Sequence, residues 1–348
     1  MKLIFSDKQL AHRPQQFMVH GRIVDPFENP VRVAALIEAL APLRLERDEP
    51  NDFGHKPIMK VHAYHYVTFL QDAYQRFVEL KDHGPEVLPN VHPYRGAGAD
   101  LGSRGRPRPT GIMGRAGWYL GDLSCAVMEH TYEAAYWSAQ TAVAGAEAIR
   151  AGERAALALC RPPGHHAYAD RASGFCYLNN AAIAAEVLRN SFAKVAIVDF
   201  DTHHGDGTQA IFYARDDVFY GSVHTDPQAY YPYFAGYADE TGSGPGQGRN
   251  LNLPLAQGAD DEAFVAANRR LAEAVTAFGA DALIISAGWD AHRDDPLSRL
   301  AVTTEAYARI GQIFGKLKLP TLIIQEGGYS LSAVAEAAPV FVSAFSNA

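Results

Sequence analysis

Short apolar segments recur along the chain, and longer amphipathic segments lie between them. The runs VAIVD at 195–199 and ALIIS at 282–286 are apolar almost throughout, which is typical of parallel strands buried on both faces. Six segments are expected to form strands: Leu3–Phe5, Ala155–Leu159, Val195–Val198, Val218–Val223, Leu283–Ser286 and Thr321–Ile324. Four segments show helical periodicity and are expected to form helices: Tyr132–Ala151, Asn180–Asn190, Asp260–Phe278 and Thr304–Lys316.

Strands and helices that alternate in this way predict an open, doubly wound, mostly parallel α/β sheet with helices on both faces. Neither an internal repeat nor a break in composition divides the 348 residues, so a single domain is expected to span residues 1–348. The stretch 82–128 is the exception, because it is rich in Gly, Pro and Arg and lacks clear periodicity. A loop of this length is usually either functional or disordered, and we interpret it as a lid or a subunit contact.

Composition narrows the class of partner and compartment. With 31 basic and 39 acidic residues the formal charge is −8, which argues against nucleic-acid binding. Three widely spaced cysteines (Cys125, Cys160 and Cys176) form no disulfide framework and favour a reducing compartment. The chain has no apolar run long enough to cross a membrane, and its first residues do not form a signal peptide. The sequence therefore predicts a cytoplasmic protein with no membrane partner.

Polar side chains follow four of the expected strands, at the edge where open α/β sheets bind their ligands. The four stretches are CRPPGHH (160–166), DFDTHHGDG (199–207), AGWDAHRDDP (287–296) and QEGGY (325–329). Because the carboxyl ends of parallel strands meet at one edge of the sheet, these side chains are expected to lie close together.

A metal site is expected among them. Asp201 and His203 are two residues apart on an extended segment, so their side chains project together. Asp290, at another strand end, is the natural third ligand. Two carboxylates and one imidazole leave an open position, as in a catalytic zinc site, although Fe²⁺ or Co²⁺ also suits this donor set. For Asp201 and His203 alone, an ordinary capped turn is the alternative. A single pair of adjacent histidines is weak evidence, because such a pair arises readily by chance in a chain with 14 histidines.

Residues for acid–base chemistry accompany the expected metal. Attack by a metal-activated water on a carbonyl needs a base for the water and an acid for the leaving amine, and neutral histidine can serve as both. His165 and His166 supply this pair, and Asp199 and Asp206 are placed to orient them. Tyr329 follows two glycines and can donate its hydroxyl to the developing oxyanion, with core packing as the alternative.

On these motifs the sequence resembles the arginase–deacetylase superfamily, specifically the histone-deacetylase-like amidohydrolases, and among them the bacterial acetylpolyamine amidohydrolases. The resemblance covers nearly the whole chain, from FSDKQLAH to QEGGYS. Its most specific stretches are CRPPGHHA, GFCYLNNAAIAA, DFDTHHGDGTQAIFY, SAGWDAHRDDP and QEGGY. It implies the arginase–deacetylase fold and a zinc-dependent hydrolase that removes acetyl groups from acetylated amines.

The resemblance also implies a role for each residue of the site. Asp201, His203 and Asp290 would ligate one zinc ion per chain, and Tyr329 would polarise the acetyl carbonyl. In the catalytic pair, His166 would be the general base and acid.

Two further groups complete the implied site. His165 would be the electrostatic partner of the base, and Asp199 and Asp206 would hold the two histidines. The remaining roles are substrate amide binding by the Gly174 carbonyl, aromatic tunnel walls from Phe175 and Tyr231, and a structural potassium site formed by Asp199, Asp201, His203, Ser222 and Val223.

The stretch 82–128 departs from the pattern of the polyamine enzymes. There it corresponds to an insertion that makes dimer contacts and narrows the tunnel mouth, which implies a homodimer and a small acylated amine as substrate. Met113 and Ser124 stand where some polyamine enzymes carry carboxylates for the distal ammonium groups, so Asp122 or Glu129 would have to substitute. The same stretch carries five arginines: Arg95, Arg104, Arg106, Arg108 and Arg115.

Three alternatives differ in chemistry or in substrate. A lysine deacetylase acting on peptides or proteins shares the chemistry and differs only at the tunnel mouth. A binuclear manganese ureohydrolase would need carboxylates two residues after the ligand histidine and the distant aspartate, where this chain has Gly205 and His292. A non-catalytic binding protein would have lost a ligand or the tyrosine, and this chain retains them all.

Overall fold

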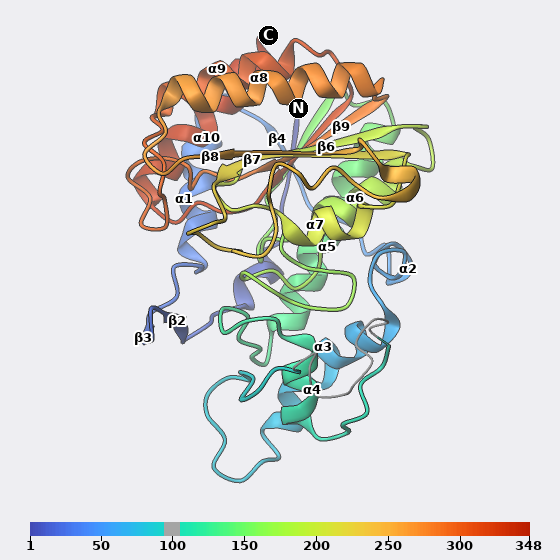
Figure 1. Cartoon of the computed structure of the whole chain (residues 1–348), viewed down its shortest axis with the longest axis vertical. Helices are drawn as coiled ribbons and strands as arrows, with labels where there is room; N and C mark the ends of the chain where they lie inside the picture. Colours follow the sequence, from blue (N-terminus) through green and yellow to red (C-terminus); the bar gives the residue numbers. More distant parts are fainter. Residues whose placement is uncertain (94–104) are drawn as a thin grey trace.

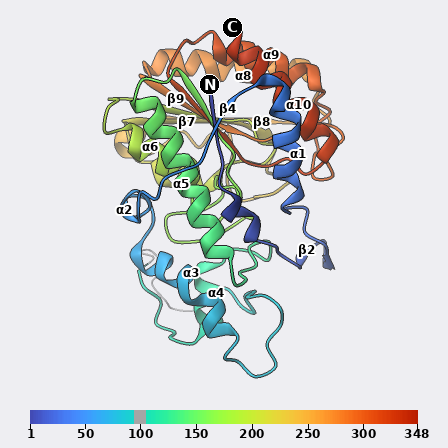
Figure 2. The same cartoon turned by 180° about the vertical axis from the view of Figure 1, so that it is seen from behind.

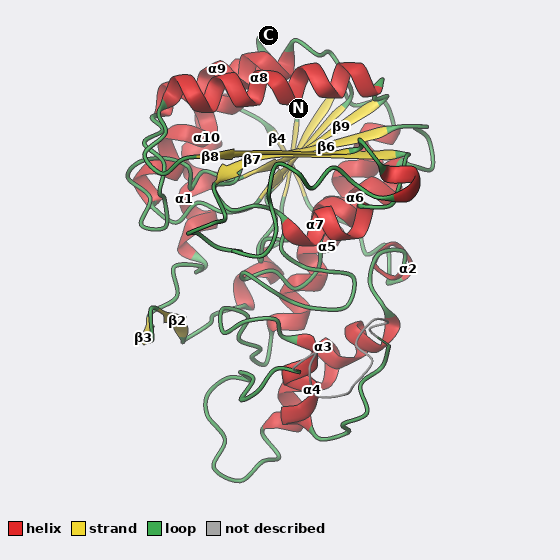
Figure 3. Cartoon of the chain, in the orientation of Figure 1, coloured by secondary structure: helices red, strands yellow, loops and turns green. Residues whose placement is uncertain are grey.

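The computed structural model describes residues 1–93 and 105–348, and within these ranges eight parallel strands form one sheet (Figures 1 and 3). In spatial order the strands are β4 (Glu46–Asp48), β1 (Lys2–Ile4), β5 (Ala155–Ala158), β10 (Thr321–Gln325), β9 (Ala282–Ala287), β6 (Val195–Asp199), β7 (Val218–Thr225) and β8 (Asn250–Leu255). All of the six expected strands are present, with ends that differ by only one or two residues. The predicted fold class is therefore confirmed.

The two outer strands were not expected from the sequence. β4 lies at one edge, and all its residues are exposed, so it has no apolar pattern to reveal it. β8 lies at the other edge, where Pro254 removes a backbone donor that a central strand would need. A separate antiparallel hairpin joins β2 (Phe17–Val19) to β3 (Arg22–Val24).

Helices cover both faces of the sheet, as the pattern predicted (Figures 1 and 2). One face packs against α1 (Val31–Leu40), α8 (Asp261–Phe278), α9 (Thr304–Gly315) and α10 (Leu331–Ser346), and the other against α5 (Thr131–Arg150), α6 (Asn180–Leu188) and α7 (Asp206–Phe212). Alternate residues of each central strand enter opposite cores: Ile284 packs on the α5 side and Leu283 on the α8 side. The remaining short elements are α2 (Lys56–Met59), η1 (Asp7–Ala11), η2 (Ala41–Leu43) and η3 (Gly244–Gly246).

The stretch 82–128 is more regular than expected. It contains the helix α4 (Ile112–Tyr119), which lies beside α3 (Tyr64–Phe77) at the end of the molecule farthest from α8 and α9 (Figure 1). The expectation of an irregular loop throughout is therefore wrong for this helix. Its buried residues other than glycine, Ile112, Ala116 and Tyr119, have helical spacing, but Gly114 and Gly117 between them obscure the pattern.

The arginines of this stretch lie in different surroundings. Arg115 forms an ion pair with Asp72 of α3, with Nη1 3.0 Å from Oδ2. Arg106 and Arg108 are exposed to solvent. Arg95 and Arg104 lie outside the described residues. Of the three arginines that the structure describes here, one is paired with α3 and two face solvent.

Two sequence expectations concern the chain as a whole. Cys125, Cys160 and Cys176 are all free and buried, so none of them forms a disulfide. Among the helices of residues 1–93 and 105–348, none is both long and apolar enough to cross a membrane.

Candidate metal centre and active site

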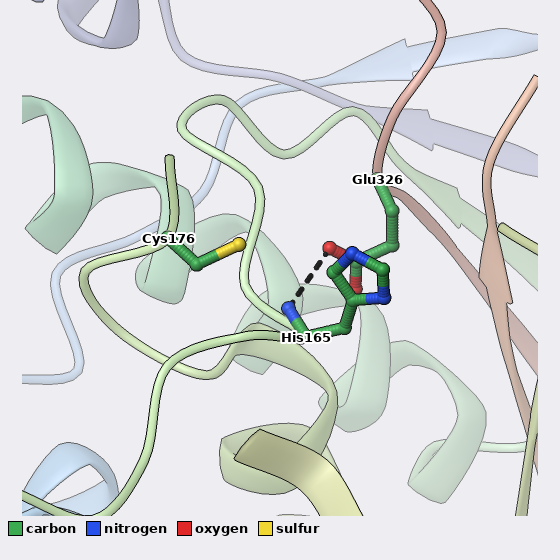
Figure 4. A group of neighbouring side chains, drawn as sticks. All are labelled: His165, Cys176 and Glu326. Carbon is green, nitrogen blue, oxygen red and sulfur yellow. Dashed lines mark hydrogen bonds between the residues drawn. The ribbon is translucent and has the colours of Figure 1, made fainter. Parts of the chain in front are cut away.

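The buried carboxylate of Glu326 fixes the corner that follows β5. Its Oε2 accepts hydrogen bonds from the backbone N–H groups of Gly164 (2.7 Å) and His165 (3.2 Å), and its Oε1 accepts one from the hydroxyl of Ser286 (3.1 Å). Figure 4 shows this carboxylate beside the backbone of His165. The corner is thereby tied to β10 and β9, and the adjacent histidines project beyond the end of the sheet.

Cys176 lies near the same carboxylate and completes a buried group with His165 and Glu326 (Figure 4). Both Glu326 oxygens are already engaged, and the thiol donates to the carbonyl oxygen of Gly174 at 3.3 Å. Burial raises the pKa of the Cys176 thiol well above its usual value. Because a metal binds the thiolate rather than the thiol, we assign this group a structural role.

The two histidines of the corner are each oriented by a carboxylate. Nδ1 of His165 lies 3.0 Å from Oδ2 of Asp199, and Nδ1 of His166 lies 2.7 Å from Oδ1 of Asp206. Burial and the adjacent His165 charge lower the pKa of His166. Although burial opposes it, the charges of Asp201 and Asp199 raise the pKa of His165. The pair thus consists of a neutral imidazole next to a cationic one, which suits a base beside an electrostatic partner.

The three expected metal ligands lie together at the ends of β6 and β9. Donor atoms of Asp201, His203 and Asp290 are all within 4.8 Å of one another, and all three residues are buried. Nδ1 of His203 lies 3.1 Å from Oδ1 of Asp201 and 3.2 Å from Oδ2 of Asp290. The structure therefore brings together two carboxylates and one imidazole nitrogen around one point.

The electrostatics of this group favour a bound cation. Burial, with the charge of Asp201, raises the pKa of Asp290 to about 7. Although burial lowers it, the neighbouring carboxylates of Asp201 and Asp290 raise the pKa of His203 to about 9. Within the described residues, Oδ2 of Asp290 has no hydrogen-bond partner. A buried carboxylate oxygen without a hydrogen-bond partner suits a metal ion. The donor set of two carboxylates and one imidazole fits zinc or another divalent metal.

The segment before Tyr329 needs a glycine at position 327, because its backbone lies against two carboxylates. A Cβ atom on Gly327 would lie 2.2 Å from Oδ2 of Asp290 and 2.5 Å from Oδ2 of Asp201. The backbone can therefore approach the two carboxylates only without a side chain, and the Gly327 N–H donates to Asp201 Oδ2 at 2.8 Å. The backbone N–H of Tyr329 in turn donates to Oδ2 of Asp295 at 2.6 Å.

A cavity of about 480 Å³ opens onto this group. Its lining includes the predicted base, one predicted metal ligand, the predicted oxyanion donor and the predicted substrate-binding residues: His166, His203, Tyr329, Gly174, Phe175 and Tyr231. The ring of Phe175 lies 5.8 Å from that of Tyr329, and the ring of Tyr231 lies 5.0 Å from that of His166. The predicted tunnel residues and the predicted catalytic residues therefore share one cavity.

The residues considered for binding the distal ammonium groups have different locations. Asp122 and Ser124 both line the cavity, whereas Glu129 is exposed beside His130 and is not among the lining residues. Met113 lies on α4 and packs against the core cluster around α3 and α5. Of the two proposed substitutes for the ammonium-binding acids, only Asp122 reaches the cavity.

Several contacting residues were not recognised in the sequence. Tyr230 stacks on His203, with ring centroids 5.0 Å apart, and its hydroxyl lies 2.8 Å from His203 Nε2. The guanidinium carbon of Arg32 lies over the ring of Tyr329, 4.5 Å from the ring centroid. The only available signal was the pair of adjacent tyrosines at 230–231, which does not show which one reaches the histidine.

The two positions that would supply carboxylate ligands for a second metal ion hold Gly205 and His292 instead. A Cβ on Gly205 would lie 2.4 Å from Oδ2 of Asp199, so a larger side chain has no room there. His292 stacks on Tyr307, and its Nε2 lies 3.2 Å from the hydroxyl of Thr304. Neither residue contributes to a binuclear centre.

The residues matched to the potassium site lie on adjacent strands. Asp199 ends β6 and pairs in register with Ser222 of β7, which Val223 follows. Asp201 and His203 are in the turn directly after β6.

The parallel eight-stranded sheet, with this group at its carboxyl edge, is the arginase–deacetylase fold. The family model for the histone deacetylase domain matches residues 26–345. The chain belongs to the histone deacetylase family, and it is a hydrolase of the deacetylase type.

Similar proteins extend over nearly the full length of the chain. The acetylpolyamine amidohydrolase of Burkholderia pseudomallei is 44% identical over 99% of this chain and 98% of its own. Acetylpolyamine amidohydrolase 1 of Pseudomonas aeruginosa is 41% identical over 96% of this chain and 95% of its own. The crystal structure of the acetylpolyamine aminohydrolase from Burkholderia pseudomallei superposes with a TM-score of 0.94 over 99% of this chain and 98% of that chain, at 44% identity.

Proposed function

We propose that this protein is a zinc-dependent amidohydrolase that removes acetyl groups from small acylated amines, with acetylpolyamines as the substrate class. The observation that carries the proposal is that the donor atoms of Asp201, His203 and Asp290 form one group, and that His203 lines the same cavity as the oriented His166 imidazole. The similarity to two acetylpolyamine amidohydrolases supports the substrate class.

Asp201, His203 and Asp290 would hold the zinc, which when bound lowers the pKa of a coordinated water and polarises the acetyl carbonyl. His166 takes a proton from the attacking water at Nε2, because Nδ1 is engaged with Asp206. Tyr329 donates its hydroxyl to the carbonyl oxygen as negative charge develops there.

The same histidine completes the reaction. The Nε2 proton of His166 passes to the leaving amine nitrogen as the amide C–N bond breaks. Amide and water are thereby converted into acetate and a free amine. The adjacent cationic His165 disfavours a second positive charge, so it helps His166 to release the proton.

The walls of the cavity suit an unbranched alkyl chain. Phe175 and Tyr231 would flank the chain, and the carbonyl of Gly174 would accept the amide N–H. We also propose a potassium ion at Asp199, Asp201, His203, Ser222 and Val223, where it would neutralise part of the negative charge behind the zinc ligands. Its test is the effect of K⁺, against Na⁺ and choline, on the melting temperature.

A homodimer formed through residues 82–128 is also proposed. The apolar side chain of Val91, in this stretch, is 63% exposed and would be covered by a partner. Sedimentation of the full chain should give twice the mass of the 37.8 kDa monomer, and a Val91→Glu variant should sediment as a monomer. A monomeric wild-type chain would refute this proposal.

The deciding experiment compares kcat/KM of the zinc-loaded protein on N-acetylputrescine and on an acetyl-lysine peptide. We expect a preference for N-acetylputrescine of at least tenfold. A preference for the peptide would show that the tunnel mouth admits a polypeptide and that the protein is a lysine deacetylase. Absence of turnover on both substrates would refute deacetylation of amines altogether.

A further inference from the structure

Asp122 accepts hydrogen bonds from three separate segments at the wall of the cavity. Its Oδ1 accepts from the N–H (2.9 Å) and the hydroxyl (2.6 Å) of Ser124. Its Oδ2 accepts from the hydroxyl of Ser173 (3.0 Å), the N–H of Gly174 (3.0 Å) and the hydroxyl of Tyr231 (2.7 Å). One carboxylate therefore joins the stretch before α5 to two of the predicted substrate-binding residues.

These bonds leave the carboxylate little capacity for another partner. An ionised carboxylate offers about four lone-pair sites, and five donors already share them here. Although burial raises it, hydrogen bonds from Ser124 and Tyr231 lower the pKa of Asp122 overall, so the group is anionic. Among the residues that the structure describes, no lysine or arginine forms an ion pair with it. The charge is stabilised by neutral donors.

Two of the groups that Asp122 holds pack against the proposed catalytic base. The ring of Tyr231 meets the ring of His166 edge-on, at 5.0 Å and 87°. A Cβ on Gly174 would lie 2.3 Å from Cδ2 of His166, so this backbone lies directly against the imidazole. Displacement of either group would change the space in which the amide must sit.

The turn at Gly174 needs an external restraint. Gly174 and Phe175 have φ angles of +55° and +66°, and the left-handed region is unfavourable for a phenylalanine. The N–H of Gly174 donates to Asp122 within this turn. The bond fixes the orientation of a peptide plane next to the carbonyl proposed to bind the substrate.

We infer that Asp122 is a positioning residue, which sets the tunnel wall by holding Tyr231 and the Gly174 turn against His166, and does not bind the distal cation of the substrate. The inference rests on the proposed function and extends it to the shape of the tunnel. It also accounts for Asp122, the one cavity-lining acid among the described residues of the stretch 82–128, without assigning it to the ammonium group.

The test compares Asp122→Asn with wild type on two amides of equal length. N-acetylputrescine carries a terminal ammonium, whereas N-pentylacetamide ends in a methyl group. Asparagine lacks the negative charge, and its NH₂ group cannot accept the hydrogen bonds that a carboxylate oxygen accepts. We therefore expect kcat/KM to fall about tenfold or more, by the same factor for both amides. Glu129→Gln, an exposed charge change seven residues away, should leave both values unchanged.

A double-mutant cycle shows whether Asp122 acts through Tyr231. Tyr231→Phe removes only the hydroxyl, so its effect should be largely lost when Asp122 is already Asn. Additive losses would overturn the inference, as would a loss confined to N-acetylputrescine, which would make Asp122 the ammonium partner. Unchanged kinetics in Asp122→Asn would also overturn it.

Two further measurements keep the test decisive. If Asp122→Asn does not fold, Tyr231→Phe and Ser173→Ala each remove a single donor and should show the same loss on both amides. If wild type hydrolyses neither amide, the proposed function fails. The role of Asp122 is then measured through the Kd of the zinc-loaded protein for pentanohydroxamate. The Kd should be higher in Asp122→Asn than in wild type if the wall is displaced, and an unchanged Kd would overturn the inference.

Discussion

The guanidinium of Arg161 donates to both oxygens of Glu28, from Nε at 2.7 Å and from Nη2 at 3.0 Å, and both side chains are fully buried. Arg161 begins the corner that carries the two proposed catalytic histidines. Glu28 also accepts a hydrogen bond from Arg32 (3.1 Å), whose Nη2 donates to the carbonyl of Glu326 (2.8 Å). A single carboxylate therefore connects the histidine corner to the segment that ends in Tyr329.

Glu28→Gln is expected to destabilise the fold strongly. The substitution leaves the charges of Arg161 and Arg32 buried without a counter-charge, which typically costs about 3–5 kcal/mol. Urea unfolding of the zinc-loaded protein measures this loss. The matched control is Glu262→Gln, which removes an ion pair with Arg309 on the surface and should change stability little. If both substitutions lowered the free energy of unfolding by the same amount, the buried ion pair would stabilise the fold no more than the surface pair does.

Tyr329→Phe should lower kcat by about 10²–10³, the usual loss when one oxyanion donor is removed. KM should change little, because the hydroxyl acts mainly on charge that develops during the reaction. Zinc content, measured by atomic absorption, serves as the control and should equal that of wild type. Near-full activity would mean that another group donates to the oxygen.

His166→Ala should abolish most activity and leave the metal in place. The imidazole is held by Asp206 and lies outside the group of three proposed metal ligands, so its loss should remove only the proposed proton carrier. Zinc content and kcat are measured on the same preparation. Loss of zinc together with activity would make His166 a ligand and refute its assignment as the base.

The central sheet was predictable because its strands are buried on both faces and therefore apolar throughout. β4 escaped prediction since an exposed edge strand has no such pattern. The residues that follow each strand indicated the site, because parallel strands end at one edge. The contact between Arg161 and Glu28 could not be predicted from the sequence, since it joins positions 133 residues apart and neither residue belongs to a repeating pattern.

Acid should weaken the fold through buried neutral histidines. Burial lowers the pKa of His62 to about 4, and its Nε2 accepts the N–H of Asn179 at 2.9 Å. Between about pH 6.5 and pH 4 the unfolded chain therefore binds more protons than the folded chain, so the free energy of unfolding falls as pH decreases across this window.

The slope is at most about 1.4 kcal/mol per pH unit for each such histidine. Urea unfolding at pH 7, 6 and 5 measures it, and His62→Gln should reduce the slope because glutamine does not titrate. His224, whose pKa burial also lowers to about 4, should keep part of the dependence. An unaltered slope in His62→Gln would contradict the prediction.

Asp290→Asn should separate stability from metal binding. In the metal-free chain Asp201 and Asp290 are two buried carboxylates in one group, and burial together with the charge of Asp201 raises the pKa of Asp290 to about 7. Above that pH the ionised Asp290 is disfavoured in the fold, so a neutral asparagine of the same shape relieves the repulsion. At pH 8, in the presence of a chelator, the melting temperature of the variant should equal or exceed that of wild type.

Added zinc should reverse the order. Wild type gains stability in proportion to the logarithm of zinc concentration over its Kd, whereas the variant lacks one anionic ligand and should gain little. Melting curves with chelator and with excess zinc give both values from one preparation. A variant that is less stable than wild type in chelator would mean that Asp290 has a structural role independent of metal, since Oδ1 also accepts the N–H of Thr202 at 3.0 Å. An equal zinc-induced shift in both proteins would remove Asp290 from the ligand set.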